Sequence, residues 1–309
     1  MAAPPELADG LAEYIETVRA GTVGRTLSLE QSRLIADRDA AAIAYPRPQG
    51  MTVVDSFVVT AGRETPVRIY RPTAETRAAL VYLHGGGFTT GSIESYDALA
   101  TALAEAAEAV VISVGYRRLP EATTRALLDE AVDTLAWTVQ MAELLSIDRD
   151  RIGVAGDSAG AFIATQLVIA ARDGAAPLPC CQLLCYGMFD IDETRTAYRE
   201  AADPVLPLPV LEAIIQTYRD RDRDDPAPPP PLQRDGLHGL PPTIILAAEH
   251  DRMREENAEY EDRLRAHGVT TTFRVAQAMP HGFLRAVRFS EAARDEMQWL
   301  GNAARPYLK

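Results

Sequence analysis

The sequence predicts an α/β fold, with a mostly parallel sheet of about eight strands and helices on both of its faces. Short apolar runs alternate with helical patterns over most of the chain. Several of the runs are apolar throughout, which is typical of strands that are buried on both faces. A glycine-bounded turn, residues 156–160, lies between one such run and an apolar helical stretch. Repeated strand, helix and strand units of this kind build a parallel sheet through right-handed crossovers.

Length and charge narrow the classes of protein. A chain of 309 residues is expected to form one large α/β unit. Its 44 acidic residues exceed its 31 basic residues, and the net charge of −13 disfavours nucleic acid and anionic lipid as partners. No stretch is apolar for long enough to span a membrane. Residues 1–5 lack the pattern of a secretion signal, so a cytoplasmic location is expected. A homodimer is left open.

The three cysteines indicate structural thiols. Cys180, Cys181 and Cys185 fall within one apolar run, which predicts a buried strand with reduced side chains. A zinc site is the alternative, but the chain has no C-x-x-C pair here and no neighbouring histidine. We therefore expect no metal and no organic cofactor.

Two helices are expected ahead of the first strand. Apolar residues recur at helical spacing over residues 7–18, and a second helical stretch covers residues 29–42. Ser28 is the predicted N-cap of the second helix, with Gln31 completing a capping box. The two helices form either a packing arm or a lid over a site, and composition does not choose between these.

The sheet is expected to begin after these helices. Residues 52–60 and 66–70 form a predicted antiparallel hairpin around Ala61-Gly62-Arg63. The remaining strands are expected at residues 79–83, 109–114, 151–155, 181–186, 243–248 and 270–275. The helices among them are expected at residues 95–107, 124–145, from 158 onward, 255–266 and 290–300. The interval between residues 186 and 243 has no convincing strand, and its helical pattern at 208–221 and proline run at 226–231 predict an insertion.

Gly156-Asp157-Ser158-Ala159-Gly160 predicts a nucleophilic serine. In a G-x-S-x-G turn between strand and helix, the serine occupies a strained backbone with its hydroxyl exposed above the sheet edge. The glycines leave room for strand and helix to approach. An ordinary strand-to-helix loop is the alternative for the motif alone, and the strand and helix that flank it favour the catalytic interpretation.

A base and an acid are expected after the serine, in the order serine, acid, histidine. His281 is the predicted base, because it follows the last predicted strand in a loop shaped by Pro280 and Gly282. Asp251, just after the strand at 243–248, is the preferred acid. Glu249 is its rival, because a slip of one residue would exchange which side chain points toward the site.

The loop His84-Gly85-Gly86-Gly87-Phe88 is expected to hold an oxyanion. Backbone N–H groups of Gly85, Gly86 and Gly87, with that of Ala159, would donate to the oxygen. A phosphate-binding loop is the alternative, but it needs a helix start and usually a lysine, and residues 88–90 offer neither. His84 is then expected to be structural.

Together these motifs resemble the hormone-sensitive-lipase family of α/β-hydrolases, which are bacterial carboxylesterases with H-G-G-G and G-D-S-A-G motifs. The resemblance rests on residues 84–87, 116–117 with 120–121, 156–160, 249–251 and 281–283. It implies an α/β-hydrolase core at 49–309, a helical cap segment at 1–48 and a second cap insertion at about 189–222. The family usually has an aspartate at the position of Gly115 and proline-leucine at the position of Arg252-Met253.

The resemblance implies a serine carboxylesterase that acts on small, short-acyl or aromatic esters. Ser158, Asp251 and His281 would form the triad, and candidate pocket walls are Phe88, Met188, Phe189 and Phe283. The alternatives are an acyltransferase, lyase or lactonase that uses the same triad, and a non-catalytic ligand-binding member of the fold.

Overall fold

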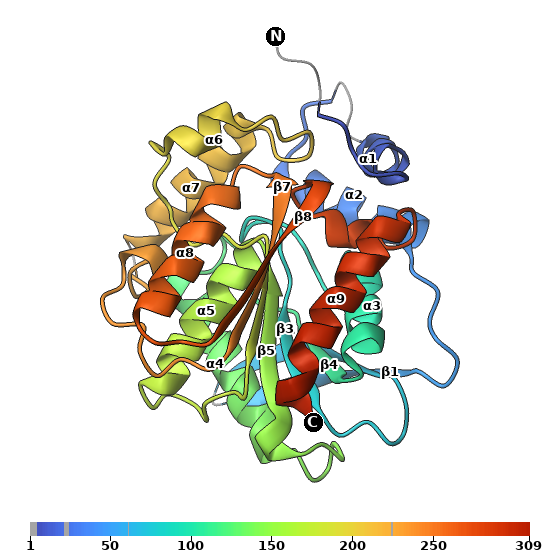
Figure 1. Ribbon diagram of the computed structural model, residues 1–309, viewed down its shortest axis with the longest axis vertical. Helices are drawn as coiled ribbons and strands as arrows, with labels where there is room; N and C mark the ends of the chain where they lie inside the picture. Colours follow the sequence, from blue (N-terminus) through green and yellow to red (C-terminus); the bar gives the residue numbers. More distant parts are fainter. Residues whose placement is uncertain (1–4, 22–24, 61, 224) are drawn as a thin grey trace.

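A single eight-stranded sheet forms the centre of the molecule (Figure 1). The computed structural model describes residues 5–21, 25–60, 62–223 and 225–309. Its strands are β1 (Thr52–Thr60), β2 (Arg63–Arg71), β3 (Ala79–Leu83), β4 (Val110–Val114), β5 (Ile152–Asp157), β6 (Gln182–Cys185), β7 (Thr243–His250) and β8 (Thr271–Pro280). They lie in the order β1-β2-β4-β3-β5-β6-β7-β8. The predicted mostly parallel α/β sheet is therefore confirmed, with antiparallel pairing only where β2 meets β1 and β4.

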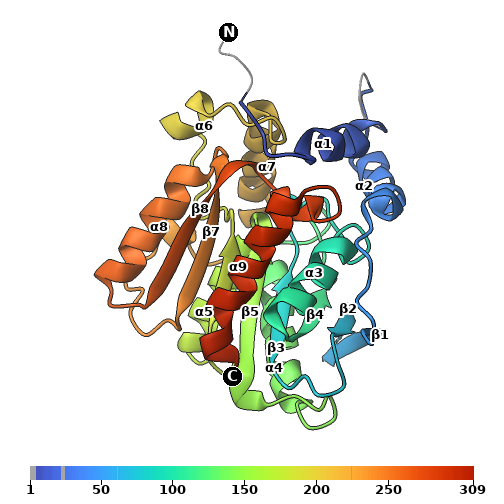
Figure 2. The same ribbon diagram turned by 45° about the vertical axis from the view of Figure 1, so that its right-hand side comes forward.

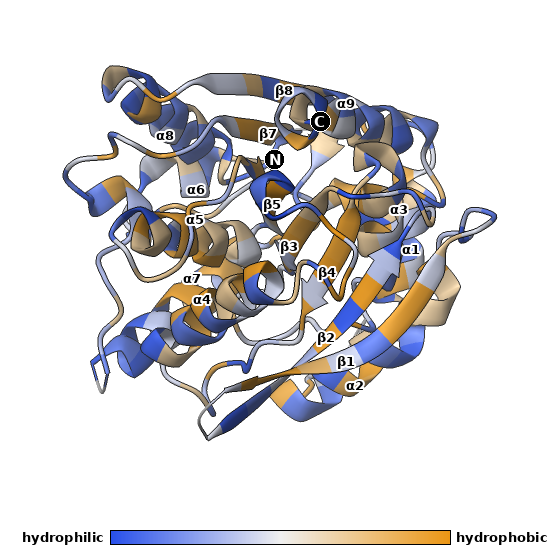
Figure 3. Cartoon of the chain, turned by 90° about the horizontal axis from the view of Figure 1, so that it is seen from below, coloured by the Kyte–Doolittle hydropathy of each residue, from blue (hydrophilic) through white to orange (hydrophobic). Residues whose placement is uncertain are grey.

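Helices cover both faces of the sheet and enclose two apolar cores. On one face lie α4 (Thr124–Gln140), α5 (Ala159–Arg172) and α8 (Arg254–Ala266). On the other lie α3 (Asp97–Ala107) and α9 (Glu291–Leu308), which run side by side in Figures 1 and 2. The central strands β3 and β4 are buried along their whole length and are mostly apolar, as their orange colour in Figure 3 shows. Burial on both faces accounts for their continuous hydrophobic sequence.

The remaining helices gather beyond one end of the sheet. They are α1 (Leu11–Arg19), α2 (Leu29–Asp39) with the 3-10 turn η1 (Ala40–Ile43), α6 (Thr196–Glu200) and α7 (Leu208–Asp222) (Figures 1 and 2). Three shorter 3-10 turns complete the described elements: η2 (Arg149–Arg151), η3 (Pro231–Gln233) and η4 (Phe283–Ala286). The first segment, with α1 and α2, and the second segment, with α6 and α7, lie far apart in the sequence. Both lie above the carboxyl ends of the parallel strands (Figures 1 and 2). None of the described helices combines the length and apolarity needed to cross a membrane.

The two N-terminal helices are attached in different ways. Leu11 and Tyr14 of α1 are buried, and the Tyr14 ring lies 6.0 Å from that of Phe289. No residue of α2 is buried, and Ser28 and Gln31 form the predicted capping box at its start. Thus α1 packs as an arm, whereas α2 is held by polar contacts.

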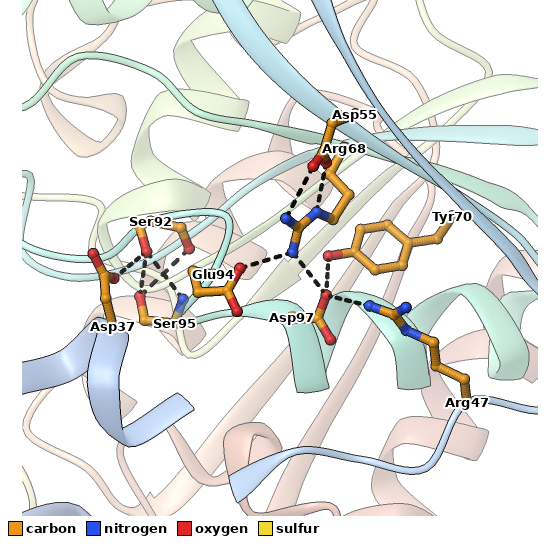
Figure 4. Close-up of polar contacts among 9 residues, drawn as sticks. All are labelled: Asp37, Arg47, Asp55, Arg68, Tyr70, Ser92, Glu94, Ser95 and Asp97. Carbon is orange, nitrogen blue, oxygen red and sulfur yellow. Dashed lines mark hydrogen bonds and ion pairs between the residues drawn. The ribbon is translucent and has the colours of Figure 1, made fainter. Parts of the chain in front are cut away.

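Some of those polar contacts form the network of Figure 4. Asp37 of α2 accepts a 2.5 Å hydrogen bond from Ser92 Oγ, and Arg47 pairs with Asp97 at 3.2 Å. Arg68 is the centre of the network, with ion pairs to Asp55, Glu94 and Asp97 at 2.7, 3.0 and 3.1 Å. Figure 4 thus shows two groups of contacts: one fastens α2 to the loop before α3, and the other joins the segment after η1 and the start of α3 to β1 and β2.

Several element boundaries differ from the prediction. The strand β8 continues to Pro280 rather than 275, because His250 pairs with Pro280 beyond a bulge in which residues 277–279 of β8 lie opposite one residue of β7. The helix α9 continues to Leu308, α4 ends at Gln140, and the five-residue α6 was not predicted. Ala61 of the predicted hairpin turn and residues 1–4 of the expected N-terminal pattern lie outside the described residues.

Candidate active site

Ser158 lies on a strained turn between β5 and α5. Its backbone angles are φ 53° and ψ −122°, which a residue with a side chain rarely adopts. The two flanking glycines are needed for space: a Cβ on Gly156 would lie 2.4 Å from the Gly160 carbonyl oxygen, and one on Gly160 would lie 2.0 Å from that of Leu83. The turn therefore presses the start of α5 against the end of β3 and holds the Ser158 side chain above the sheet.

Ser158, His281 and Asp251 form a continuous hydrogen-bonded chain. Ser158 Oγ lies 2.8 Å from His281 Nε2, and His281 Nδ1 lies 2.8 Å from Asp251 Oδ2. The other oxygen of Asp251 accepts the Met253 N–H at 2.8 Å. All three residues are buried, with Ser158 and His281 each 8% exposed and Asp251 3% exposed. This is the geometry in which a histidine can take a proton from a serine while a carboxylate fixes its tautomer.

Glu249, the rival acid, has a different role in the structure. Its Oε2 accepts the backbone N–H of Ala278 at 2.7 Å, which fastens β7 to the end of β8. Asp251 is therefore the acid that contacts His281.

Charge around His281 favours its protonated form. Burial alone would lower the pKa of His281, but the carboxylates of Asp251, Asp203 and Asp157 reverse that effect and raise it to about 9. Asp157 is itself buried, and burial raises its pKa to about 6 although hydrogen bonds from Tyr82 and Gly85 oppose the change. The site is thus prepared to stabilise an imidazolium.

The N–H groups of the glycine loop after β3, residues 85–87, differ in whether they already have a hydrogen-bond acceptor. The N–H of Gly85 donates to Asp157 Oδ1 at 2.8 Å, so this predicted oxyanion donor is engaged elsewhere, and its inclusion in the oxyanion group was wrong. Gly86 and Gly87 have φ of 112° and 58°, and among the described residues neither they nor Ala159 donate to a recorded acceptor. The donors that remain are Gly86, Gly87 and Ala159.

His84 supports this loop from behind. Its ring stacks between those of Tyr96 and Tyr116, at centroid distances of 5.4 and 4.3 Å. Burial lowers the pKa of His84 to about 4, so the ring is neutral, and its Nδ1 donates to the Gly85 carbonyl at 2.8 Å. Tyr116 also donates to the His84 carbonyl at 2.6 Å. The expected structural role of His84 agrees with these contacts.

Asp157 is a residue that the sequence analysis missed. It holds the first glycine of the loop and accepts a 2.7 Å hydrogen bond from Tyr82 on β3. Its position directly before Ser158 in the G-D-S-A-G motif was a signal that could have identified it. Asp157 was considered only as part of that motif. It ties the serine turn to the oxyanion loop through one carboxylate.

The four predicted pocket residues lie deep in the protein. Phe88, Met188, Phe189 and Phe283 are at most 1% exposed. The Phe189 ring stacks on Tyr260 at 4.3 Å, and Phe283 packs against Tyr186 at 5.4 Å. Their contacts in the described structure are those of core residues, and their place in a substrate pocket stays a prediction.

Asp203, Asp251 and His281 bring their ligand-type atoms within 4.8 Å of one another. A carboxylate and imidazole group of this kind can hold a cation. Here both ring nitrogens of His281 already have hydrogen-bond partners in Ser158 and Asp251. The arrangement is therefore that of a proton relay.

The charge around His281 predicts how serine reactivity depends on pH. Neutral His281 is needed to take the Ser158 proton, so the rate of labelling by a fluorophosphonate should rise with pH. Because the pKa of His281 is raised, the midpoint should lie above the usual value of about 6.5. Inactivation rates measured from pH 5 to 10 test this. A rate that stays flat down to about pH 5 would contradict it, and His281→Asn should label at a low rate without the ionisation.

Comparisons with known proteins agree with this geometry. A family model described as the alpha/beta hydrolase fold matches residues 80–285. The chain is 32% identical to an ethyl acetate hydrolase of Pseudomonas putida, over 96% of this chain and 98% of that protein. It is 33% identical to an arylesterase of Saccharolobus solfataricus, over 74% and 75% of the two chains.

Solved structures show the same fold. A hyperthermophilic esterase from the archaeon Pyrobaculum calidifontis has a TM-score of 0.88 and 27% identity, and the match covers 97% of this chain and 98% of that one. An esterase from the bacterial hormone-sensitive lipase family has a TM-score of 0.85 over the full length of both chains, at 23% identity.

Proposed function

The chain belongs to the α/β-hydrolase family, and from this premise we propose that it is a serine carboxylesterase with Ser158, His281 and Asp251 as its triad. The observation that carries the proposal is the pair of 2.8 Å contacts from Ser158 through His281 to Asp251, placed on a strained turn at a strand end. Relatives named ethyl acetate hydrolase and arylesterase support hydrolysis of a carboxylic ester.

Acylation begins at Ser158. Its Oγ attacks the ester carbonyl carbon while His281 Nε2 takes the hydroxyl proton. Asp251 accepts the Nδ1–H of His281 and stabilises the imidazolium. The same proton then passes to the leaving alcohol oxygen as the C–O bond breaks, which leaves the acyl group on Ser158.

Deacylation repeats these steps with water. His281 takes a proton from water, the resulting hydroxide attacks the acyl carbon, and the proton returns to Ser158 Oγ as the carboxylic acid leaves. In both halves of the reaction the carbonyl oxygen becomes negative, and the N–H groups of Gly86, Gly87 and Ala159 donate to it. Losing one such donor typically costs roughly 100- to 1000-fold in rate.

The two segments above the sheet end act as a cap. Arg33 of α2 donates to the carbonyl oxygens of Thr89 and Leu119, both at 2.7 Å, and pairs with Glu121 at 2.8 Å. From the other segment, Ile214 of α7 lies directly over the oxyanion loop, because a Cβ on Gly87 would lie 2.4 Å from Ile214 Cδ1. Residues of both segments thus lie at the C-terminal end of that loop, at Gly87 and at Thr89.

A groove between α2 and α7 gives the proposed path for substrate. Its volume is about 780 Å³, and most of its lining is apolar or uncharged. The residues that line it include Leu29, Thr89, Val210, Ala213, Ile214 and Thr217. Thr89 places one part of the groove beside the oxyanion loop. A groove of this size and character favours small neutral esters, and the net charge of −13 disfavours anionic ones.

Phe88, Met188, Phe189 and Phe283 stay predicted pocket walls, with Phe88 the best supported because it follows Gly87 directly. A homodimer and a cytoplasmic location likewise stay predictions, and light scattering of the purified chain measures the first.

Hydrolysis of a chromogenic ester series tests the proposed function. We expect activity that peaks at short acyl chains between acetate and decanoate, and a loss of at least about 10⁴-fold in Ser158→Ala. Absence of activity on every ester, or full activity in the variant, would contradict the proposal. Product analysis with added alcohols would reveal acyl transfer.

The cap proposal predicts a separate effect for Arg33. Replacing it with alanine releases α2 from the oxyanion loop, so kcat/KM should fall by about tenfold or change its acyl-length profile, as loss of charged hydrogen bonds implies. The free energy of unfolding should change little, because α2 buries no residue. Arg38→Ala is the control, since Arg38 is exposed on the same helix and pairs with the adjacent Asp39. Equal effects of the two variants would refute the cap role of Arg33.

A further inference from the structure

A second buried carboxylate lies beside the His281–Asp251 pair. Asp203 comes from the segment between α6 and α7, and only 7% of it is exposed. One of its oxygens lies within 4.8 Å of ligand-type atoms of both Asp251 and His281. The triad mechanism above uses Asp251 alone, so the position of Asp203 needs its own explanation.

Turn capping accounts for only one of the two oxygens of the Asp203 carboxylate. Oδ1 accepts the backbone N–H groups of Val205 and Leu206, at 2.8 and 3.1 Å. Oδ2 is buried and has no hydrogen-bond partner among the described residues. A buried oxygen without a partner is costly, and a serine could cap the same turn with a single oxygen. The charge of Asp203 is therefore not needed by the turn.

Arg252 fixes the distance between Asp203 and the triad. Its Nε donates to the Leu206 carbonyl at 2.7 Å, and its guanidinium also donates to the Tyr198 carbonyl. Arg252 directly follows Asp251 in the chain. The turn that carries Asp203 and the loop that carries Asp251 are thus clamped together, by a residue at which the sequence departs from the family pattern.

We propose that Asp203 is a positioning residue that supplies a second negative charge to His281 as His281 accepts the Ser158 proton. The inference rests on the proposed esterase function. The insertion that carries Asp203 then takes part in proton transfer, because His281 reaches its full basicity only when this segment lies against the triad.

The charges around His281 give the direction of the effect. The groups that face it are Asp251 from the loop after β7, Asp203 from the cap, Asp157 from the end of β5, and the Tyr186 ring after β6. Burial, and then the charge of Asp251, raises the pKa of Asp203 to about 6, so it is ionised at neutral pH. A negative charge this close in a poorly solvated site raises the pKa of His281, and its removal should lower that pKa.

The test is the pH profile of kcat/KM for a chromogenic acetate ester with Asp203→Asn. The amide keeps the turn-capping oxygen and removes the charge. We expect the apparent pKa of the acidic limb to fall by about one unit and the high-pH plateau to fall by about tenfold, since His281 becomes a weaker base. KM should stay within about twofold, because Asp203 does not touch substrate.

Asp192→Asn is the matched control. Asp192 lies in the same insertion and caps a similar turn by accepting the Thr194 N–H at 2.9 Å, but it is not buried beside the triad. It should leave both the pKa and the plateau unchanged. Arg252→Gln is the second variant, in which Asp203 keeps its charge but loses its clamp, and a smaller fall of the same pKa is expected.

The outcomes separate the two proposals. An unchanged pKa in Asp203→Asn, with or without a lower plateau, would overturn the role of Asp203 and leave it as a turn cap. If Asp203→Asn does not fold, an unchanged pKa in Arg252→Gln would overturn it instead. In either case an inactive Ser158→Ala would leave the esterase function standing, whereas an active one would remove the function itself.

Discussion

The approach of Gly160 to the end of β3 is the contact on which the rest of the site depends. A Cβ on Gly160 would lie 2.0 Å from the Leu83 carbonyl oxygen, so no other residue fits there without moving the backbone. This contact sets α5 directly against the strand that leads into the oxyanion loop. The serine turn and the proposed oxyanion donors therefore lie close together, and the backbone of Ser158 is strained at this point.

Buried carboxylates organise that volume. Asp157 links Gly85 and Tyr82 to the serine turn, and so sets which N–H groups of the loop remain for an oxyanion. Asp251 orients His281. Carboxylates in a poorly solvated interior raise one another's pKa values unless a cation lies near, and the imidazolium formed during acyl transfer is such a cation. The electrostatic strain of the resting site is thus relieved in the transition state.

The sequence predicted the mostly parallel sheet and the serine turn, because these depend on local patterns, whereas Asp251 and His281 were chosen from their order in the chain and from the family resemblance. Continuous apolar runs identify buried strands, and G-x-S-x-G needs its glycines for steric reasons. Gly85 was misassigned because three adjacent glycines look equivalent in sequence, and only the contact with Asp157 distinguishes the first of them.

Other features depend on contacts between segments that are distant in the sequence, and local patterns do not predict them. The end of β8 was missed because the register with β7 is interrupted after Ala276, where the Glu249 side chain accepts the Ala278 N–H, and resumes only where His250 pairs with Pro280. Asp203 and Arg252 meet only when the insertion folds over the triad, and no local pattern announces this. The choice between arm and lid was open for a similar reason, and the structure has α1 packed as an arm while α2 contacts the core through polar groups.

The mass of the enzyme during turnover tests most directly whether Ser158 is the nucleophile. The chain is mixed with a chromogenic acetate ester, quenched in acid within the first turnovers and digested, and the peptides are weighed. Acylation of Ser158 would place one acetyl group on the peptide that contains this residue, and we expect none in Ser158→Ala. Acetylation of a different peptide would contradict this role of Ser158. Rapid hydrolysis without any acylated peptide, in the wild-type enzyme or in His281→Asn, would contradict it as well.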